Sequence, residues 1–333
     1  MYTHDLSPFV EFLDGWLTGY ALGPTGSYTR HLHRTGYDST HPDAYGCADA
    51  ANILYMLGRL PADPGERAAW VASLQSFQDP ATGIFTDGSH STYHTTAHCT
   101  AALELFEARP AHRLTFLSEL RDPDRLRAFL DALDWDRPWP ASHDAAGAAS
   151  ALAITGEAAP GWFETYFDWF NAEADPDTGM WRRGRMLPVD EWPGLFSNLG
   201  GSFHYHFVYD YFRQPWPYPD RVIDTSLSLL YDSAGSFAET EIGFKDIDLV
   251  FCLSRARRQT AHRFDEVGAA LSLLADRVAA LLRDPDYLAS DHLDDVHTTF
   301  GAVCTVAELQ RAVPGSLGTP VPLRLVLDRR PFI

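Results

Sequence analysis

The sequence predicts an all-α protein in which the helices come in pairs and form a single domain, residues 1–333. Two observations carry this prediction: apolar residues recur at helical spacing along most of the chain, and two kinds of helix alternate. The chain has 333 residues, of which 45% are hydrophobic and 21% charged, so it has ample material for a core. No linker rich in serine, glycine and proline divides it, which favours one domain over two.

The first helix is expected to begin at Ser7 and Pro8, a cap and a first-turn proline that precede apolar residues at helical spacing. The same spacing then predicts eleven more helices, ten of them in pairs. Their expected ranges are 47–58 and 66–77, 92–107 and 126–133, 142–156 and 162–172, 202–212 and 220–231, 246–259 and 264–283, and finally 294–312. Outside these ranges only short turns and the last residues resemble strands.

The paired helices differ in composition. Segments such as 47–58, 143–156 and 300–310 are rich in alanine and glycine and nearly uncharged, whereas their partners carry charge on one face. A helix that is apolar all round is buried on all sides, and an amphipathic helix has a solvent face. We therefore expect an (α/α)6 toroid, an inner ring of six helices inside an outer ring of six. A linear α-solenoid also alternates two helices, but these repeats differ in length and a ring needs no capping repeats.

The phrase Asp-Pro-x-Thr-Gly leaves two of the outer helices, at 79–83 and 175–179, and is typical of a turn. An aromatic residue, Phe85 or Trp181, follows each glycine by two positions. With these turns the sequence resembles two superfamilies of α/α-toroid enzymes. One is the six-hairpin glycosidases, including unsaturated-uronyl hydrolases, in which D-x-x-T-G-x-W turns are frequent. The other is the terpenoid cyclases with protein prenyltransferases, in which Q-x-x-x-x-G-x-W or F recurs.

Charge and cysteine content limit the partners and the compartment. The 45 acidic and 26 basic residues give a formal charge of −19, which repels phosphate backbones and anionic surfaces and predicts neither a nucleic-acid nor a membrane partner. The N-terminus lacks the pattern of a signal peptide, and the most apolar later stretch, 267–282, is interrupted by Asp276 and Arg277. Four cysteines lie far apart within helical patterns, as reduced core residues of a cytoplasmic protein do: Cys47, Cys99, Cys252 and Cys304.

The resemblance implies a pocket at the end of the ring where loops lead into the inner helices. Seven of the 14 histidines fall near the starts of these otherwise apolar helices, and their convergence predicts a polar pocket, because buried polar groups are costly unless paired. The polar residues at these positions are Tyr45, Asp49, Asn52, His90, Tyr93, His94, His98, His143, Asp144, His204, His206, Asp246, Asp248, Asp294, Asp295 and His297. Alternatively, carboxylates at helix starts serve as N-caps, and single inner histidines are satisfied core residues.

Carboxylates suit acid and base catalysis at such a pocket. Glycoside hydrolysis needs two facing carboxyl groups, or one where the substrate carries its own enol ether. We expect Asp144 and Asp248 to be catalytic, with His94 and His204 as acid, base or anion-binding partners. The expected substrate-binding residues, including two tryptophans that could stack on sugars, are Tyr45, Asp49, Asn52, His90, Tyr93, Trp139, His143, Trp192, His206, Asp246 and His297.

A metal site on one helix is not expected. Histidines at 90, 94 and 98 share a helix face, but positions eight residues apart lie about 12 Å apart along a helix, so one ion cannot bind all three. No H-E-x-x-H motif or cysteine pair supplements them. The sequence therefore predicts neither a bound metal nor a cofactor.

The sequence favours a glycoside or unsaturated-uronyl hydrolase that acts on small soluble oligosaccharides. A polysaccharide lyase or sugar epimerase would instead use Tyr93, His94 and Asn52 for proton abstraction, and a non-catalytic binding toroid would lack an acid–base pair. The expected fold also resembles that of terpenoid cyclases, which carry an acidic D-x-D-D motif. The segment Asp246-Ile-Asp248-Leu lacks the last aspartate of this motif. The apolar segment 322–333 is expected to dock on the ring or on a partner chain, which leaves a homo-oligomer open.

Overall fold

A computed structural model describes residues 2–189, 192–232 and 237–333, and the described part of the chain is mostly helical. Its α-helices are α1 (Ser7–Gly19), α2 (Ala44–Met56), α3 (Pro64–Gln75), α4 (Thr92–Glu104), α5 (Pro123–Ala132), α6 (Pro138–Thr155), α7 (Trp162–Glu173), α8 (Gly194–Tyr211), α9 (Pro219–Asp232), α10 (Phe244–Ala256), α11 (Phe264–Leu282), α12 (Pro285–Leu288) and α13 (Val296–Ala312). Short 3-10 helices lie at Thr115–Leu117, Glu119–Arg121 and Asp291–Leu293. Two short strands, β1 (His4–Asp5) and β2 (Leu317–Gly318), pair in parallel. The prediction of an all-α protein is confirmed.

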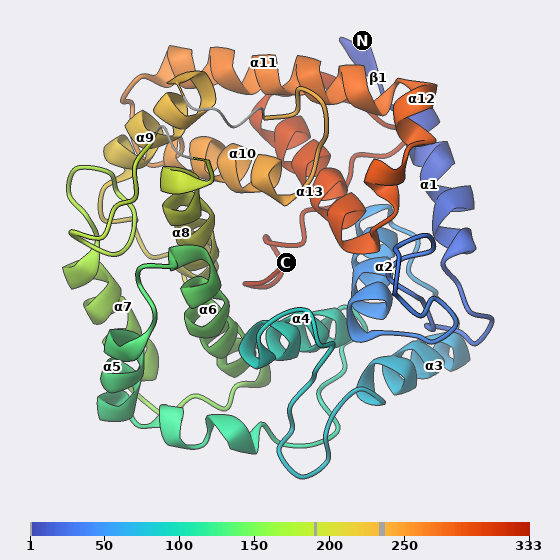
Figure 1. The fold of residues 1–333 in the computed structure, drawn as a ribbon, viewed down its shortest axis with the longest axis horizontal. Helices are drawn as coiled ribbons and strands as arrows, with labels where there is room; N and C mark the ends of the chain where they lie inside the picture. The colour runs from blue at the N-terminus through green and yellow to red at the C-terminus, as the bar shows by residue number, and fades with distance from the viewer. Residues whose placement is uncertain (1, 190–191, 233–236) are drawn as a thin grey trace.

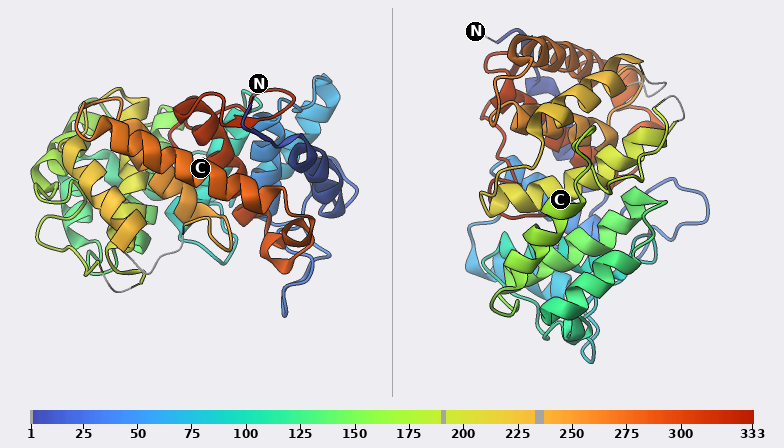
Figure 2. Two further views of the ribbon diagram at one scale, coloured as in Figure 1. Left: turned by 90° about the horizontal axis from the view of Figure 1, so that it is seen from above. Right: turned by 90° about the vertical axis from the view of Figure 1, so that its left-hand side faces the viewer.

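Six helices enclose the centre of the molecule (Figure 1). Along the chain α2, α4, α6, α8, α10 and α13 each pack against the next, and α13 packs against α2 to close the cycle of contacts. The other long helices lie outside these six, as the views from two further sides also show (Figure 2). The six inner helices are almost entirely buried, whereas α3 on the outside buries only Trp70 and Leu74.

Neighbouring inner helices approach one another backbone to backbone. A Cβ atom on Gly147 of α6 would lie 2.7 Å from the carbonyl oxygen of Tyr93, and one on Gly201 of α8 would lie 2.7 Å from that of Pro138. Glycine is therefore required at these contacts, although it weakens an isolated helix. The observed helices also correct two predicted boundaries. Helix α6 begins at Pro138 and α8 begins at Gly194, well before the predicted positions 142 and 202.

Both Asp-Pro-x-Thr-Gly turns have the same local structure. Gly83 and Gly179 adopt φ values of 79° and 73°, a conformation that L side chains rarely adopt. The aromatic residues that follow, Phe85 and Trp181, are buried, and each backbone N–H donates at 3.1 Å to a hydroxyl on an inner helix, that of Thr96 in the first turn. The repeated phrase therefore anchors the outer loops to α4 and α8.

The last residues of the chain lie inside the ring (Figure 1). The backbone N–H of Arg324 donates to the carbonyl of Met56, the last residue of α2. Arg330 is buried and donates to the carbonyl of Ala101 at 2.8 Å, and the ring of Phe332 lies 4.8 Å from that of His94. The segment expected to dock on the ring thus fills its interior.

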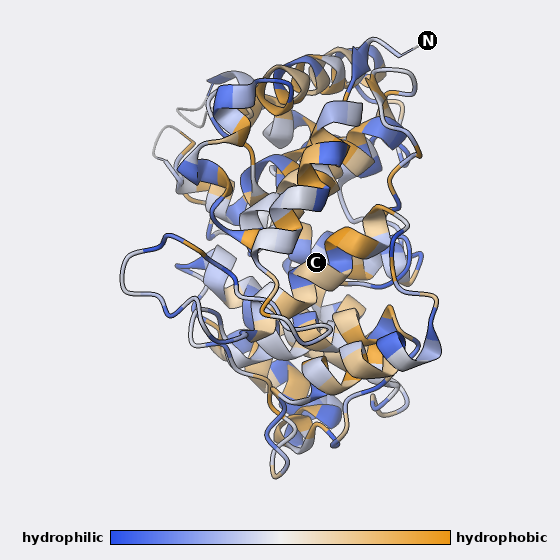
Figure 3. Cartoon of the chain, turned by 90° about the vertical axis from the view of Figure 1, so that its right-hand side faces the viewer, coloured by the Kyte–Doolittle hydropathy of each residue, from blue (hydrophilic) through white to orange (hydrophobic). Residues whose placement is uncertain are grey.

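Polar and apolar residues separate as expected for a folded domain. In Figure 3 the loops that project from the molecule are mostly blue, whereas orange residues concentrate in the helices. All four cysteines are buried and carry free thiols, as predicted. Within the described ranges, no helix combines the length and the apolar character that crossing a membrane requires.

Candidate functional site

A cavity of about 480 Å³ opens where the inner helices begin. Eight of the predicted site residues line it: His90, His94, Trp139, His143, Trp192, His204, Asp248 and His297. They come from α4, α6, α8, α10, α13 and the loops that lead into them. The structure thus brings together histidines and one aspartate that are far apart in the sequence.

Seven predicted site residues do not line this cavity: Tyr45, Asp49, Asn52, Tyr93, Asp144, His206 and Asp246. Several have structural partners instead. Asn52 accepts a hydrogen bond from Arg330, and the ring of His206 stacks on Trp216 with centroids 3.8 Å apart. Asp246 accepts a hydrogen bond from the backbone N–H of Gly243 at 2.8 Å, as a helix-capping carboxylate does.

Tyr93 and Asp144 do not line the cavity, although they are neighbours of His94 and His143 in the sequence. The ring of Tyr93 packs against Phe116 and Phe129, with centroids 5.5 Å apart in both contacts. Asp144 is partly buried, and burial raises the pKa of its carboxyl. Side chains one position apart point in different directions from a helix, so only one of each pair can reach the cavity.

The cavity also contains residues that sequence reasoning missed: Phe196, Glu241, Ile242, Gly243, Phe244, Lys245, His292, Thr298 and Ile333. Phe244 and Lys245 directly precede the predicted residue Asp246. Their position at the start of an inner helix could therefore have identified them as residues that line the cavity. Phe196 stood outside the predicted range of its helix. Nothing in the pattern indicated that Ile333 enters the ring.

Asp248 is the buried carboxyl group of the cavity. Its side chain is 1% exposed, and its Oδ2 has no hydrogen-bond partner within the described residues. Burial, and then the nearby carboxyl of Asp246, raise the pKa of Asp248 well above its usual value. Gly200 makes room for this carboxyl, since a Cβ atom there would lie 3.0 Å from Oδ2. The surroundings of Asp248 therefore favour its protonated form, which can donate a proton.

A second group of polar residues lies beside the cavity around Asp49. This buried carboxylate accepts hydrogen bonds from Nε2 of His98 at 2.8 Å and from Nδ1 of His297 at 3.0 Å. Burial raises the pKa of Asp49, but its two histidine partners outweigh that effect and hold it below the usual value. Burial lowers the pKa of His297 to about 4. His297 is thus a neutral imidazole whose Nδ1 proton is held by a carboxylate, which leaves Nε2 as a base.

Tyr45 is packed between the histidines. Its ring stacks on those of His90 and His98, with centroids 4.2 and 4.7 Å apart, and its hydroxyl forms a hydrogen bond with Nδ1 of His94. Burial raises the pKa of this phenol well above its usual value. Tyr45 therefore stays protonated and fixes the orientation of His94.

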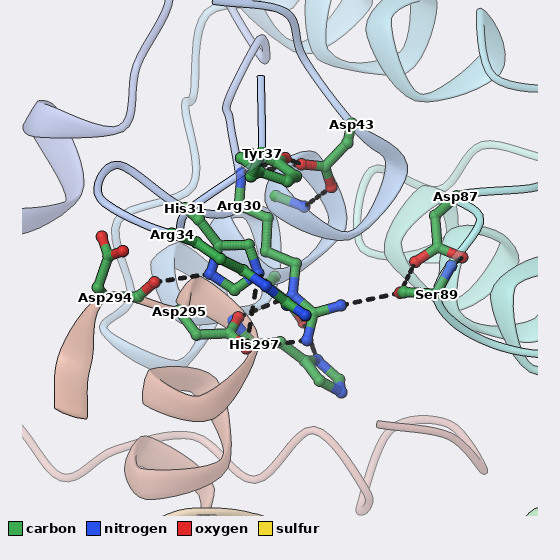
Figure 4. A network of polar contacts seen from close by, with 12 residues as sticks. Arg30, His31, Arg34, Tyr37, Asp43, Asp87, Ser89, Asp294, Asp295 and His297 are labelled. Carbon is green, nitrogen blue, oxygen red and sulfur yellow. Dashed lines mark hydrogen bonds and ion pairs between the residues drawn. The ribbon is translucent and has the colours of Figure 1, made fainter. Parts of the chain in front are cut away.

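An ion-pair network holds the start of α13 in place (Figure 4). Arg30 donates to both carboxylate oxygens of Asp295, at 2.8 and 2.9 Å, and to the hydroxyl of Ser89 at 3.0 Å. Asp295 in turn accepts from the backbone N–H of His297 at 2.9 Å, as an N-cap. The network thereby fixes the backbone that carries His297 and ties it to the loop before His90.

Three histidines on three neighbouring helices converge at the cavity. His94 of α4, His143 of α6 and His204 of α8 each offer a nitrogen, and these nitrogens lie within 4.8 Å of one another. Burial, and then the neighbouring imidazoles, lower the pKa of His94 and of His143, and burial lowers that of His204 to about 4. Neutral imidazoles are the form that binds metals. A second group with ligand atoms this close is Asp49, His98 and His297.

Comparison of the chain with protein-family models, with curated proteins and with solved structures gave no match. The chemistry of the cavity must therefore be argued from its own residues.

Proposed function

We propose that the chain is an (α/α)6-toroid enzyme that acts on small soluble carbohydrates, and that its reaction is the hydrolysis of unsaturated uronyl oligosaccharides. Asp248 carries this proposal as a buried acid on the wall of a cavity large enough for a small sugar. A carboxyl group kept neutral by its surroundings is the form of aspartate that donates protons at neutral pH.

The number of carboxyl groups favours an enol-ether substrate over an ordinary glycoside. Among the described side chains that line the cavity, only those of Asp248 and Glu241 are carboxyl groups, and Glu241 is exposed and paired with Lys245 at 3.4 Å and His292 at 3.5 Å. A retaining or inverting glycosidase needs two carboxyl groups that flank the bond. An unsaturated uronyl residue needs one acid, because water adds across its own double bond.

In this reaction Asp248 gives its proton to one carbon of the double bond, and water attacks the neighbouring carbon. His297 takes a proton from that water through Nε2, while Asp49 holds Nδ1 and stabilises the imidazolium that forms. The product is a hemiketal, which opens and releases the second sugar. The proton lost by Asp248 is balanced by the proton gained at His297.

The remaining walls suit a sugar with a carboxylate. Trp192 is 46% exposed and stacks on Phe196, with ring centroids 5.0 Å apart, and Trp139 meets the same ring edge-on at 5.5 Å. Aromatic faces of this kind bind the apolar faces of sugars. Lys245 lies on the cavity wall at the start of α10, where a cation and a helix N-terminus both favour an anion.

A sugar epimerase or lyase is the second candidate, and the pair of His297 and Asp49 favours it. A neutral histidine that is oriented by a carboxylate can remove a proton from a carbon next to a carboxylate or carbonyl group. A terpenoid cyclase is a poorer fit, because six imidazoles line the cavity and would take up a proton from a carbocation.

The test is to compare Asp248→Asn with Asp144→Asn, the same change at a carboxyl that does not line the cavity. Unsaturated uronyl disaccharides, neutral aryl glycosides, and sugars assayed for proton exchange with deuterated water would separate the reactions. We expect turnover of the unsaturated disaccharide to fall about 10²–10⁴-fold in Asp248→Asn, or about 3–5 kcal/mol of barrier, and about twofold or less in Asp144→Asn. Solvent exchange without hydrolysis would favour the epimerase or lyase, and equal losses in both variants would contradict the role of Asp248.

A further inference from the structure

The three converging histidines of α4, α6 and α8 have no partner that explains their arrangement. His94, His143 and His204 bring one nitrogen each to within 4.8 Å of the others, and no hydrogen bond joins the three rings within the described part of the chain. All three line the cavity. We propose that they bind a divalent transition metal of the zinc class, with a coordination position open to the cavity.

Hydrogen bonds behind the rings hold the histidines as they hold metal ligands. Nδ1 of His204 lies 2.8 Å from the carbonyl oxygen of Gly200, which can only accept, so this nitrogen carries the proton and Nε2 has the free lone pair. Nδ1 of His94 meets the hydroxyl of Tyr45, whose oxygen can accept in the same way. Bound metals use histidines whose other ring nitrogen is fixed by a carbonyl, carboxylate or hydroxyl.

His143 differs from the other two in having no hydrogen bond among the described residues; its side chain is partly buried and lies on the cavity wall. Its ring lies 4.5 Å from that of His94 and 5.5 Å from that of His204, measured between centroids. Packing three imidazoles this closely brings their lone pairs together, which is unfavourable without a cation or a water molecule between them. A metal ion satisfies all three nitrogens at once.

In the second group of possible ligands, hydrogen bonds already join the members to one another. Asp49 already accepts hydrogen bonds from the N–H groups of His98 and His297, at 2.8 and 3.0 Å. A metal bound to Asp49 would have to displace protons from two good hydrogen bonds. A metal bound to His94, His143 and His204 would break no hydrogen bond among these three residues. The geometry therefore selects the histidines of α4, α6 and α8.

The spacing fits a zinc-class ion after a small adjustment. Zinc binds histidine nitrogen at about 2.0–2.1 Å, so two nitrogens in a tetrahedron lie about 3.4 Å apart. The observed limit of 4.8 Å requires an approach of at most about 1.4 Å, which rotation of the rings provides. Three histidine ligands and one open position are typical of catalytic rather than structural zinc, and imidazole ligands also suit cobalt, nickel and iron.

Gly200 connects this site to the proposed acid. Its carbonyl accepts from His204, and its Cα faces the carboxyl of Asp248. A metal ion would place a bound water, or an oxygen of a substrate, on the same cavity wall as that acid. The metal site nevertheless stands on the three histidines alone and is independent of the reaction proposed above.

The experiment measures metal binding directly, with no need for turnover. The purified chain is stripped with a chelator and titrated with Co²⁺, whose visible absorption reports four-coordinate binding, and then with Zn²⁺ in competition. We expect one Co²⁺ per chain, displaced by one Zn²⁺. Replacing a ligand in His143→Gln or His204→Gln should weaken binding by about 100-fold or more. His90→Gln, in the same cavity but outside the group, should retain affinity within about threefold.

His143→Gln is the more informative variant, because the residue has no hydrogen bond to lose, and circular dichroism would verify that it folds. The proposal is overturned if the wild-type chain binds no Co²⁺ at a metal concentration of about 10⁻⁴ M, or if His143→Gln binds Co²⁺ as tightly as the wild type does. Loss of binding in His297→Gln with retention in His143→Gln would assign the ion to the Asp49 group and overturn it as well.

Discussion

The two ends of the ring of inner helices are built from the same helices but treat their polar groups in opposite ways. Where the helices end, the chain's last residues fill the ring, and the buried Arg330 donates to the carbonyls of Ala101 and Phe332 and to the side chain of Asn52. Where they begin, a cavity stays open and Asp248 keeps an unpaired oxygen. Folding alone would favour the first solution, and for this reason we propose that the second end is a ligand site.

The largest expected effect is on stability in acid, and four of the five histidines that cause it line the cavity. Burial lowers the pKa of five histidines below the usual 6.5: His94, His143, His204, His206 and His297. The unfolded chain therefore binds protons that the folded chain does not, and stability present above about pH 6.5 is lost as the pH falls toward about 4. Each proton is worth about 1.4 kcal/mol per pH unit, so five give a limiting slope of about 7 kcal/mol per unit.

Urea unfolding at pH 7.5, 6 and 5 measures this slope. Asp248 acts in the opposite sense, because its raised pKa stabilises the fold below about pH 3.8 and loses that contribution as the pH rises. His206→Gln should reduce the slope by about one proton without touching the cavity. A free energy of unfolding that stays constant from pH 7.5 to 5 would show that the histidines are charged in the folded protein.

The next effect tests the filled end. Arg330→Ala should cost about 3–5 kcal/mol, because it leaves buried carbonyls and the side chain of Asn52 without a donor. Its neighbour Arg329 pairs with Glu104 and Glu107 at the surface, so Arg329→Ala should cost about 1 kcal/mol or less. Equal losses on thermal or urea unfolding would remove the contrast between the two ends.

The sequence could predict the helices because alanine-rich and amphipathic segments differ visibly in composition. It could not predict where α8 begins, because Gly200 and Gly201 look like a helix break until a neighbouring helix is seen to need their small size. It also could not place the last residues. An apolar tail that ends in Phe332 and Ile333 fits inside a ring as well as on its surface, and only the packing decides.

Candidate site residues were predictable as a population more than individually. Histidines near the starts of alanine-rich helices indicated a polar cavity, but His206 turned out to pack on Trp216 two positions from His204. From the sequence, a metal site was considered only for histidines on one helix, at positions 90, 94 and 98. The distance along the helix between the first and the last of these positions prevents one ion from binding all three. The ligand set that the structure favours uses three helices, which no spacing within the sequence reveals.

A smaller effect is expected where the open end meets a helix contact. In Gly200→Ala the new methyl group would lie 3.0 Å from Oδ2 of Asp248, so the carboxyl must shift by a few tenths of an ångström. We expect a cost of about 1–3 kcal/mol in stability and about a tenfold loss of turnover, since the acid is displaced rather than removed. A variant that loses stability but keeps full turnover would show that the position of Asp248 does not matter.

The smallest effect is expected at Asp144, which the sequence ranked beside Asp248 as a catalytic acid. Both carboxyls have raised pKa values, but Asp144 lies off the cavity and only Asp248 lines it. Asp144→Asn should therefore change turnover about twofold or less, against the loss of orders of magnitude expected for Asp248→Asn. Since the ionised form of a partly buried carboxyl is the costly one, Asn should raise stability at pH 7 by up to about 1 kcal/mol. That gain should vanish below about pH 3.8, where the native aspartate is protonated in both folded and unfolded states. A hundredfold loss of turnover in Asp144→Asn would instead place the chemistry outside this cavity and reject the cavity as the active site.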